Sequence, residues 1–195
     1  MNNLAIDKRF MMSINREIPT YLTPDEIHQL LDSCNNKRNH LLINLGWQCG
    51  ARISELLEIK RENIDFDNRL IRLITLKKRN QKKSKKAERT IPIQPELTTE
   101  IASFVAQNNL NGDRLFPITR IQAFNIIKQV AKKSNFHKKI SPHTLRHSFA
   151  VHTLVQGVPL PVVSQLLGHS QISTTLIYLK IISPDIKNLM MNVRF

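Results

Sequence analysis

Residues 141–147 read Ser-Pro-His-Thr-Leu-Arg-His, and this stretch marks where one helix of the fold begins. Serine is a favoured N-cap residue and proline suits the first helical turn, so the helix is expected to start at Ser141 and Pro142. His143 and Arg146 then lie one turn apart on one face of that helix.

Similar start and stop signals predict helices elsewhere in the chain. Thr23-Pro24-Asp25-Glu26 combines an N-cap residue, a first-turn proline and a glutamate three residues after the cap. Asn39 is expected to cap a second helix that ends near Gly50, and a third short helix follows from Ile53 to about Ile59. Apolar residues at helical spacing indicate further helices around 97–105, 124–131 and 159–168, and a last one running through Tyr178.

The segment from residue 69 to residue 93 changes to the period of a β-strand. Residues 69–74 read Arg-Leu-Ile-Arg-Leu-Ile, which we interpret as a half-buried strand, and residues 89–93 are typical of a returning partner strand. Between them lies the densest charge run of the chain. We therefore expect a mainly α protein with a small antiparallel β-sheet (α+β), formed as a hairpin or three strands. One domain is expected over residues 21–180, with an arm at 1–20 and a tail at 181–195.

The composition points to a polyanionic partner. Twenty-nine Lys and Arg against fifteen Asp and Glu give a formal charge of +14, whose usual reason is binding to nucleic acid. No apolar stretch approaches the ~20 residues that span a bilayer, and the N-terminus lacks the pattern of a signal peptide. Cys34 and Cys49 form no metal or redox motif. A cytoplasmic protein that binds DNA or RNA is the expectation.

Four local features carry chemistry, although each has an ordinary structural explanation when taken alone. Arg52 and Glu55 could be a surface ion pair, which contributes only about 0.2–0.5 kcal/mol. His169 follows Gly168 on a turn, and Tyr178 could simply pack on an amphipathic helix.

The fourth feature, His143 with His147 one turn later, invites a metal interpretation. A zinc protease needs a glutamate directly after the first histidine, and that position here is Thr144. No carboxylate or third histidine lies at a suitable spacing, so no metal site is expected.

Taken together and in this order, the features resemble the catalytic boxes of the tyrosine recombinase (phage integrase) family. The resemblance covers about residues 22–180. It includes the gaps of 23 residues from Arg146 to His169 and of nine from His169 to Tyr178. The matching positions are Gly50, Arg52, Glu55 and Leu56, then His143, Arg146 and His147, then Leu167 to Ser170, and finally Thr174, Thr175 and Tyr178.

The resemblance implies a DNA-cutting enzyme that uses no metal, cofactor or ATP. Arg52 and Arg146 would neutralise the charge that develops on the phosphate. His143 and His169 would add hydrogen bonds, and His143 would take the proton of the nucleophile Tyr178. The product would be a 3′-phosphotyrosine and a free 5′-hydroxyl. Glu55, which can brace Arg52, and His147 are assigned supporting roles.

The family also uses a lysine of the β-hairpin to protonate the leaving 5′-oxygen. We assign this role to Lys77, at the end of the first strand, although Lys78, Lys82 and Lys83 are alternatives. The remaining basic residues of the hairpin are expected to contact the DNA backbone. The expected DNA-binding residues, including the three alternative lysines, are Lys78, Arg79, Lys82, Lys83, Lys85, Lys86 and Arg89.

The resemblance further implies double-stranded DNA as the substrate and a homo-tetramer on paired sites, without excluding a monomer in the absence of DNA. Most members carry an N-terminal helical domain that closes over the DNA, whereas only about twenty residues precede the catalytic domain here. In this respect the chain is similar to the short invertases that switch fimbrial promoters, and an accessory DNA-binding protein is a further expected partner. The tail could pack on its own domain or dock on a neighbouring subunit.

Other functions remain open at this stage. A topoisomerase-like nicking and closing enzyme would use the same residues. A catalytically inactive DNA-binding regulator of the same fold would keep the charge without the reaction. A structural RNA-binding protein would explain the charge but none of the spacings. The outcome of recombination, whether integration, excision, inversion or resolution, depends on where the DNA sites lie.

Overall fold

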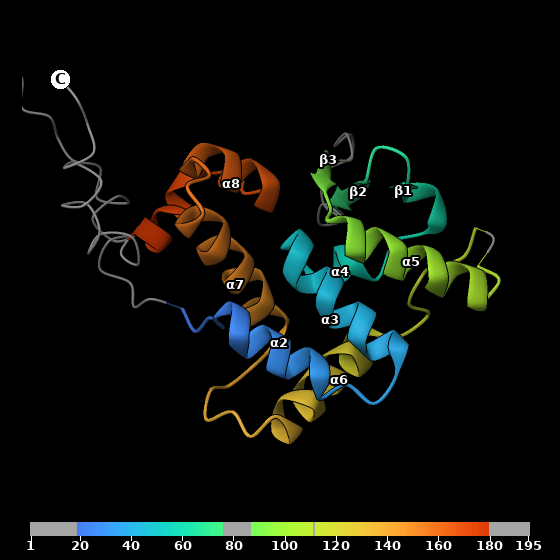
Figure 1. Ribbon diagram of the computed structural model, residues 1–195. Coiled ribbons are helices and arrows are strands. Elements are labelled where there is room, and N and C mark those ends of the chain that lie inside the picture. The colour runs from blue at the N-terminus through green and yellow to red at the C-terminus, as the bar shows by residue number, and fades with distance from the viewer. Residues whose placement is uncertain (1–18, 76–86, 111, 180–195) are drawn as a thin grey trace, which may run out of the picture.

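The computed structural model describes residues 19–75, 87–110 and 112–179 (Figure 1). The fold is mainly helical with one small antiparallel sheet, as expected from the sequence. The longer helices of this part of the chain are α2 (Pro24–Asp32), α3 (Lys37–Cys49), α5 (Pro95–Gln107), α6 (Arg120–Lys133), α7 (Pro142–Val155) and α8 (Leu160–Leu167). The shorter elements are α4 (Ile53–Leu56) and the 3-10 turns η1 (Arg61–Asn63), η2 (Ile172–Thr174) and η3 (Leu176–Tyr178).

Helix α3 lies in the middle of the helical part and supports the elements that carry the site. It packs against α2, α4, α5, α6 and α7, which surround it in Figure 1. Residues 41–46 are all buried, whichever side of α3 they lie on, and Leu41, Leu42, Ile43, Leu45 and Cys49 are fully buried. A helix that is apolar on most sides belongs in the interior, so α3 is the core around which the other helices are placed.

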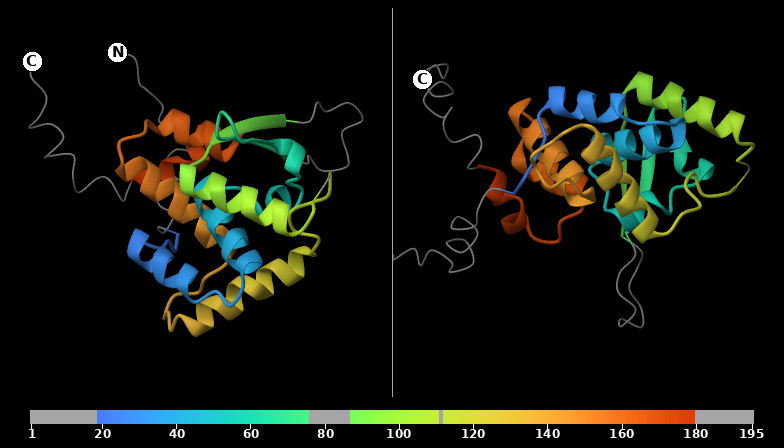
Figure 2. Two further views of the ribbon diagram at one scale, coloured as in Figure 1. Left: turned by 45° about the vertical axis from the view of Figure 1, so that its right-hand side comes forward. Right: turned by 90° about the horizontal axis from the view of Figure 1, so that it is seen from below.

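The sheet consists of β1 (Ile64–Asp65), β2 (Leu70–Thr75) and β3 (Ala87–Pro92) in that order, all antiparallel. In its register Ile71 faces Ile91, and Leu73 faces Arg89. Directly paired residues point to the same side of a sheet. Ile71, Leu73 and Ile91 are buried, so Arg89 also points toward the interior. The sheet lies beside two helices, with β2 in contact with α4 and β3 in contact with α8 (Figure 2).

The predicted start of α2 is confirmed by a complete capping box, in which Thr23 and Glu26 each bond the other's backbone N–H. The cap predicted for the second helix is wrong. Asn36 is the N-cap, and its side chain accepts a hydrogen bond from the Asn39 backbone at 2.9 Å. Asn39 therefore already lies in the first turn of α3.

The last helix predicted from the sequence is also corrected. Two 3-10 turns, η2 and η3, take its place as far as Tyr178. Their backbone bonds connect residues three apart, as from Tyr178 to the Thr175 carbonyl at 3.1 Å. Ser173, Thr174 and Thr175 are weak helix formers, and the Thr175 side chain is engaged elsewhere in the structure. The third helix, α4, is likewise shorter than the expected Ile53–Ile59.

Candidate active site

The first part of the site is the sharp turn between α3 and α4. Gly50 ends α3 at a φ of 55°, and a Cβ there would lie 2.4 Å from the Phe149 ring, so only glycine fits. Arg52 is the N-cap of α4, and Glu55 accepts hydrogen bonds from its backbone N–H (2.9 Å) and from its guanidinium (3.0 Å). The Glu55 side chain is 1% exposed and that of Arg52 is 36% exposed. The turn thus holds a braced arginine at the surface.

Three arginines from three different elements meet at the end of α8. Each donates to one of three successive backbone carbonyls, where the negative end of a helix dipole attracts cations. The hydrogen bonds are Arg89 Nε to the Leu166 carbonyl (2.6 Å), Arg146 Nη2 to the Leu167 carbonyl (2.7 Å) and Arg52 Nη2 to the Gly168 carbonyl (3.2 Å). Arg52 and Arg146, which are 94 positions apart in the chain, therefore lie side by side.

The capping pattern predicted for α7 places Arg146 in this cluster. Ser141 accepts a hydrogen bond from the Thr144 backbone, and Pro142 occupies the first turn. One turn later the Arg146 guanidinium also donates to the Gly50 carbonyl at 2.7 Å. Burial lowers the pKa of Arg146 to about 10, and the neighbouring charge of Arg52 adds to this effect. Arg146 therefore remains a cation at neutral pH.

A single carboxylate, Glu55, faces these three guanidiniums among the residues that the structure describes. Its own burial would raise its pKa, but the hydrogen bonds and charge of Arg89 outweigh this effect and lower the pKa to about 2. Arg89 reaches both carboxylate oxygens, at 3.1 and 2.7 Å, and Thr75 donates to one of them at 2.9 Å. Two positive charges of the cluster stay uncompensated, which favours binding of an anion such as phosphate.

The structure corrects the expectation that Arg89 contacts the DNA backbone with the other basic residues of the hairpin. Its side chain is 8% exposed, and its hydrogen bonds go to Glu55, Thr75 and the Leu166 carbonyl. A guanidinium held on three sides joins the sheet to α4 and α8. Arg89 is therefore a support for the site rather than part of a DNA-binding surface.

His169 follows directly after the arginine-bound carbonyls. Gly168 ends α8 at a φ of 66°, and the His169 ring is held by Thr175, whose hydroxyl lies 2.7 Å from Nδ1. Burial lowers the pKa of His169 to about 4, and the nearby cations, Arg146 first, add to this. The ring is neutral at pH 7 and can donate a single hydrogen bond to an anion through one nitrogen.

Tyr178 lies on η3 and is 2% exposed, packed against Phe149, Leu167 and other side chains of α7 and α8. Its hydroxyl lies 2.6 Å from Nδ1 of His147. Burial raises the pKa of Tyr178 to about 12 against the opposing effect of Arg146. The expected proton acceptor was His143, but the side chain found on the hydroxyl is His147. His143 is exposed, and its ring centroid is 6.5 Å from that of His147.

The other basic residues predicted for the hairpin, six lysines and one arginine, cannot be placed relative to this cluster. They lie between Thr75 and Ala87, outside the described residues, so their roles stay predictions. This applies to Lys77, Lys78, Arg79, Lys82, Lys83, Lys85 and Lys86.

A hollow of about 940 Å³ opens beside the arginine cluster. It is lined by Arg52, Arg72, Arg89, Gly168, His169 and Ser170, together with residues of β2, β3 and α8. One carboxylate, Glu88, also lines it and pairs with Arg72 at 3.8 Å, so the arginines remain in excess. Its basic lining suits a phosphate group. Over the described ranges, no group of three or more His, Cys, Asp or Glu side chains could hold a metal ion. No helix of those ranges is long and apolar enough to cross a membrane.

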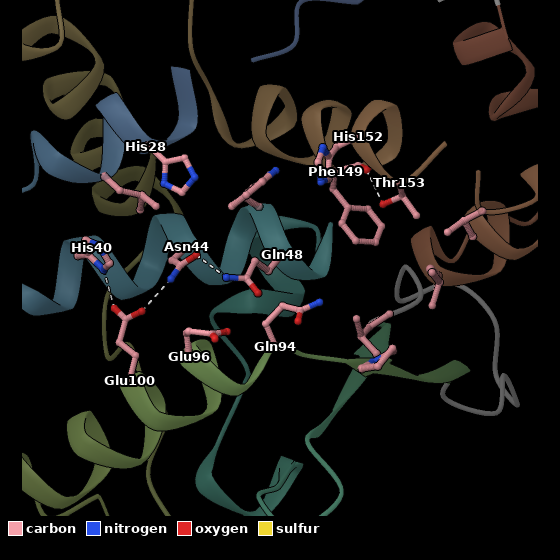
Figure 3. Close-up of a pocket in the computed structure, with 16 residues that line it drawn as sticks. His28, His40, Asn44, Gln48, Gln94, Glu96, Glu100, Phe149, His152 and Thr153 are labelled. Carbon is pink, nitrogen blue, oxygen red and sulfur yellow. Dashed lines mark hydrogen bonds and ion pairs between the residues drawn. The ribbon is translucent and has the colours of Figure 1, made fainter. Parts of the chain in front are cut away.

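A second hollow, of about 700 Å³, lies between α2, α3, α5 and α7 (Figure 3). It is largely apolar and has Leu166 in common with the first hollow. A chain of hydrogen bonds runs along one wall, from His40 to Glu100 (2.6 Å), to Asn44 (2.8 Å) and to Gln48 (2.8 Å). The buried Oε1 of Gln48, at the end of this chain, has no hydrogen-bond partner among the described residues. None of these groups belongs to the arginine cluster.

The chain matches a known protein family over most of its length. The sequence pattern of the phage integrase family matches residues 20–182. The chain belongs to the phage integrase family. A tyrosine recombinase of Pseudothermotoga lettingae is 34% identical over 88% of this chain and 60% of its own length. Tyrosine recombinase XerA of Pyrococcus furiosus is 32% identical over 89% of this chain and 62% of its length. The chain thus spans about 60% of these curated relatives.

Solved structures of the phage integrase family share the fold. A XerA recombinase superimposes with a TM-score of 0.76 at 24% identity, covering 92% of this chain and 68% of that one. The catalytic domain of bacteriophage HP1 integrase has a TM-score of 0.65 at 25% identity and covers 90% of this chain and 99% of that one. A XerH site-specific recombinase bound to its difH substrate gives 0.69 at 22% identity, over 84% and 51% of the two chains.

Two features of this phage integrase family member were not predicted from its sequence. The first is the inward position of Arg89, although the strand alternation could have found it, because Arg89 and the apolar Ile91 are two residues apart and share a face. The second is Thr175, which is fully buried and holds His169. A threonine six residues from a histidine carries no signal of that contact, since the turn between them sets the geometry.

Proposed function

We propose that this chain is the DNA-breaking and rejoining domain of a site-specific recombinase that acts through a 3′-phosphotyrosine at Tyr178. The observation that carries this proposal is the meeting of Arg52 and Arg146 at the end of α8. His169 follows on the same turn. The curated relatives named tyrosine recombinases support the same activity.

The arginine cluster can supply the charge that such a reaction needs. Attack on a phosphodiester builds negative charge on the non-bridging oxygens, and preorganised cations stabilise that charge. Arg52, which lines the open hollow, can reach an oxygen directly. Arg146 lies behind it and adds its charge and its remaining N–H donors. Because two positive charges are uncompensated in the free protein, the site is prepared for an anion before DNA arrives.

The histidines and a lysine complete the proposed reaction. His169 is neutral and can donate a hydrogen bond to the phosphate, while His143 is exposed on the first turn of α7 and can do the same. The leaving 5′-oxygen needs a proton, which we assign to Lys77 by resemblance to the family. The energy of the broken bond is retained in the phosphotyrosine ester, so a second DNA end can attack it without ATP.

The test is the trapping of a covalent protein–DNA complex. The protein is incubated with a library of nicked duplexes of varied sequence, in which the fragment behind the nick diffuses away after cleavage. A band that survives denaturation is expected for the natural chain and is expected to be absent for Tyr178→Phe. Sequencing of the trapped DNA gives the site. DNA binding without any covalent band would instead favour the inactive regulator of the same fold.

Exchange between two sites is the second half of the proposal. Two duplexes with one cut on each strand need four active sites, so we propose a homo-tetramer on paired DNA sites. We also propose an accessory DNA-binding protein as a further partner. We further propose that the tail, residues 181–195, docks on a neighbouring subunit. Deleting the residues after Ile182 should then keep cleavage of single sites but abolish recombination of paired sites on a plasmid, and equal loss of both would contradict the docking.

A further inference from the structure

The first turns of α7 carry a pair of histidines of which the second touches Tyr178. His143 and His147 are one turn apart, with ring centroids 6.5 Å apart and ring planes inclined by 33°. His147 Nδ1 lies 2.6 Å from the Tyr178 hydroxyl, and the two rings are 5.8 Å apart. Of the two histidines, the inner one is therefore in hydrogen-bond contact with the phenol and the outer one faces solvent.

We infer that His147 is the catalytic base that takes the proton of Tyr178, and that the outer His143 contacts the phosphate instead. This inference rests on the proposed function and adds a residue to it. A general base must lie within hydrogen-bond reach of the proton that it removes, and His147 meets this requirement.

The step can be written so that every proton is accounted for. The Tyr178 O–H bond breaks, and its proton moves to the Nδ1 lone pair of His147, which becomes a cation. The phenolic oxygen forms a bond to phosphorus while the bond from phosphorus to the 5′-oxygen breaks. The 5′-oxygen takes its proton from the ammonium group of the hairpin lysine. On rejoining, the 5′-hydroxyl attacks, the lysine recovers its proton, and His147 returns the other proton to the phenol.

The free protein holds this pair in an unreactive state. Burial lowers the pKa of His147 to about 4, with His143 and Arg146 adding to the effect, whereas the pKa of Tyr178 is raised to about 12. The proton therefore stays on the phenol, which limits attack on stray phosphodiesters. A DNA phosphate bound beside Arg146 would offset the positive charge that disfavours protonated His147. Transfer of the Tyr178 proton to His147 would therefore be easier when DNA is bound.

Two substitutions separate the base from a mere hydrogen-bond partner. His147→Asn keeps an acceptor for the phenol but cannot take a proton, and His147→Phe keeps the ring volume without either property. His152→Asn is the matched control on the same helix. His152 packs on Trp47 in the second hollow, away from the proposed site. The readout is the rate of covalent complex formation in a single turnover. We expect both variants at position 147 to lose about 10²–10⁴-fold, as for removal of a general base, and the control to keep its rate.

Fluorinated tyrosine distinguishes a catalytic base from a residue that only supports the structure, because it changes the acidity of the phenol. The chain has two tyrosines, so Tyr21→Phe leaves Tyr178 as the one site that is labelled. Fluorination lowers the pKa of the phenol and reduces the need for a base. It should therefore restore most of the rate of His147→Asn but not that of His143→Asn. Rescue at position 143 and not at position 147 would overturn the inference in favour of His143.

The contact itself can be checked without DNA. In the free protein, the ¹⁹F resonance of fluorinated Tyr178 should shift in His147→Phe and stay in place in His143→Asn. An unchanged resonance in both variants would show that the hydrogen bond is absent and would overturn the inference, whatever the cleavage result. A shifted resonance in a protein that forms no covalent complex with any DNA would instead overturn the proposed function, and the role of base with it.

Discussion

Replacing Glu55 with glutamine removes the carboxylate that compensates the arginine cluster. The Glu55 side chain is 1% exposed and is bonded by Arg89, Arg52 and Thr75. Glutamine keeps the shape and some of the hydrogen bonds but leaves three guanidiniums without a counter-charge. Removing one partner of a buried ion pair typically costs about 3–5 kcal/mol.

The pKa of Glu55 gives a second, similar value for the stability that this carboxylate contributes. It is lowered from 4.5 to about 2 by the fold, and a difference of this size corresponds to about 3 kcal/mol of stability. Because the folded pKa lies below the unfolded one, this contribution is complete above pH 4.5 and is lost as the pH falls toward 2. About 2 kcal/mol of it is gone by pH 3. The deficit of Glu55→Gln relative to the natural chain should therefore shrink between pH 7 and pH 3.

Urea denaturation at pH 7, 5 and 3 measures both effects, with the fluorescence of the chain's single tryptophan, Trp47, as the probe. Glu58→Gln is the matched control. Glu58 pairs with Arg114 at 2.8 Å, but the two side chains are 34% and 49% exposed, so the loss should stay below about 1 kcal/mol. Equal losses for the two variants, or a loss for Glu55→Gln that does not change with pH, would refute the account of the cluster.

Three further substitutions test the supports of the site. Arg89→Lys keeps the charge but cannot bridge Glu55 and the Leu166 carbonyl in the same geometry. Thermal denaturation should therefore show a free energy of unfolding that is lower by about 2 kcal/mol. Non-specific DNA affinity and its salt dependence should stay unchanged. A lower affinity would return Arg89 to the DNA-binding surface. Gly50→Ala should cost about 2–4 kcal/mol in urea denaturation, because it combines a left-handed φ with a clash on Phe149. Thr175→Val removes the hydroxyl partner of Nδ1 of the half-buried His169, so it should lower the free energy of unfolding by about 1–2 kcal/mol and slow cleavage. Thr175→Ser should retain the stability and the cleavage rate. Equal behaviour of the two variants would contradict the role of the hydroxyl.

Much of the fold and half of the site can be predicted from the sequence because the signals are local. The caps at Thr23 and Ser141 act within one helical turn, and the glycines at positions 50 and 168 end helices by their own left-handed conformation. The spacings of Arg52, Arg146, His169 and Tyr178 are likewise a property of the chain alone. The charge of +14 indicates the class of partner without any structure.

The tertiary structure alone decides how these residues meet. Arg89 counts as one more basic residue in the sequence, but its partner carbonyl on α8 is 77 positions away, and this contact turns it from a surface group into a buried support. The choice between His143 and His147 as the partner of Tyr178 depends in the same way on how η3 packs on α7. A local pattern places a side chain on one face of an element, whereas the group that it meets depends on the packing of distant elements.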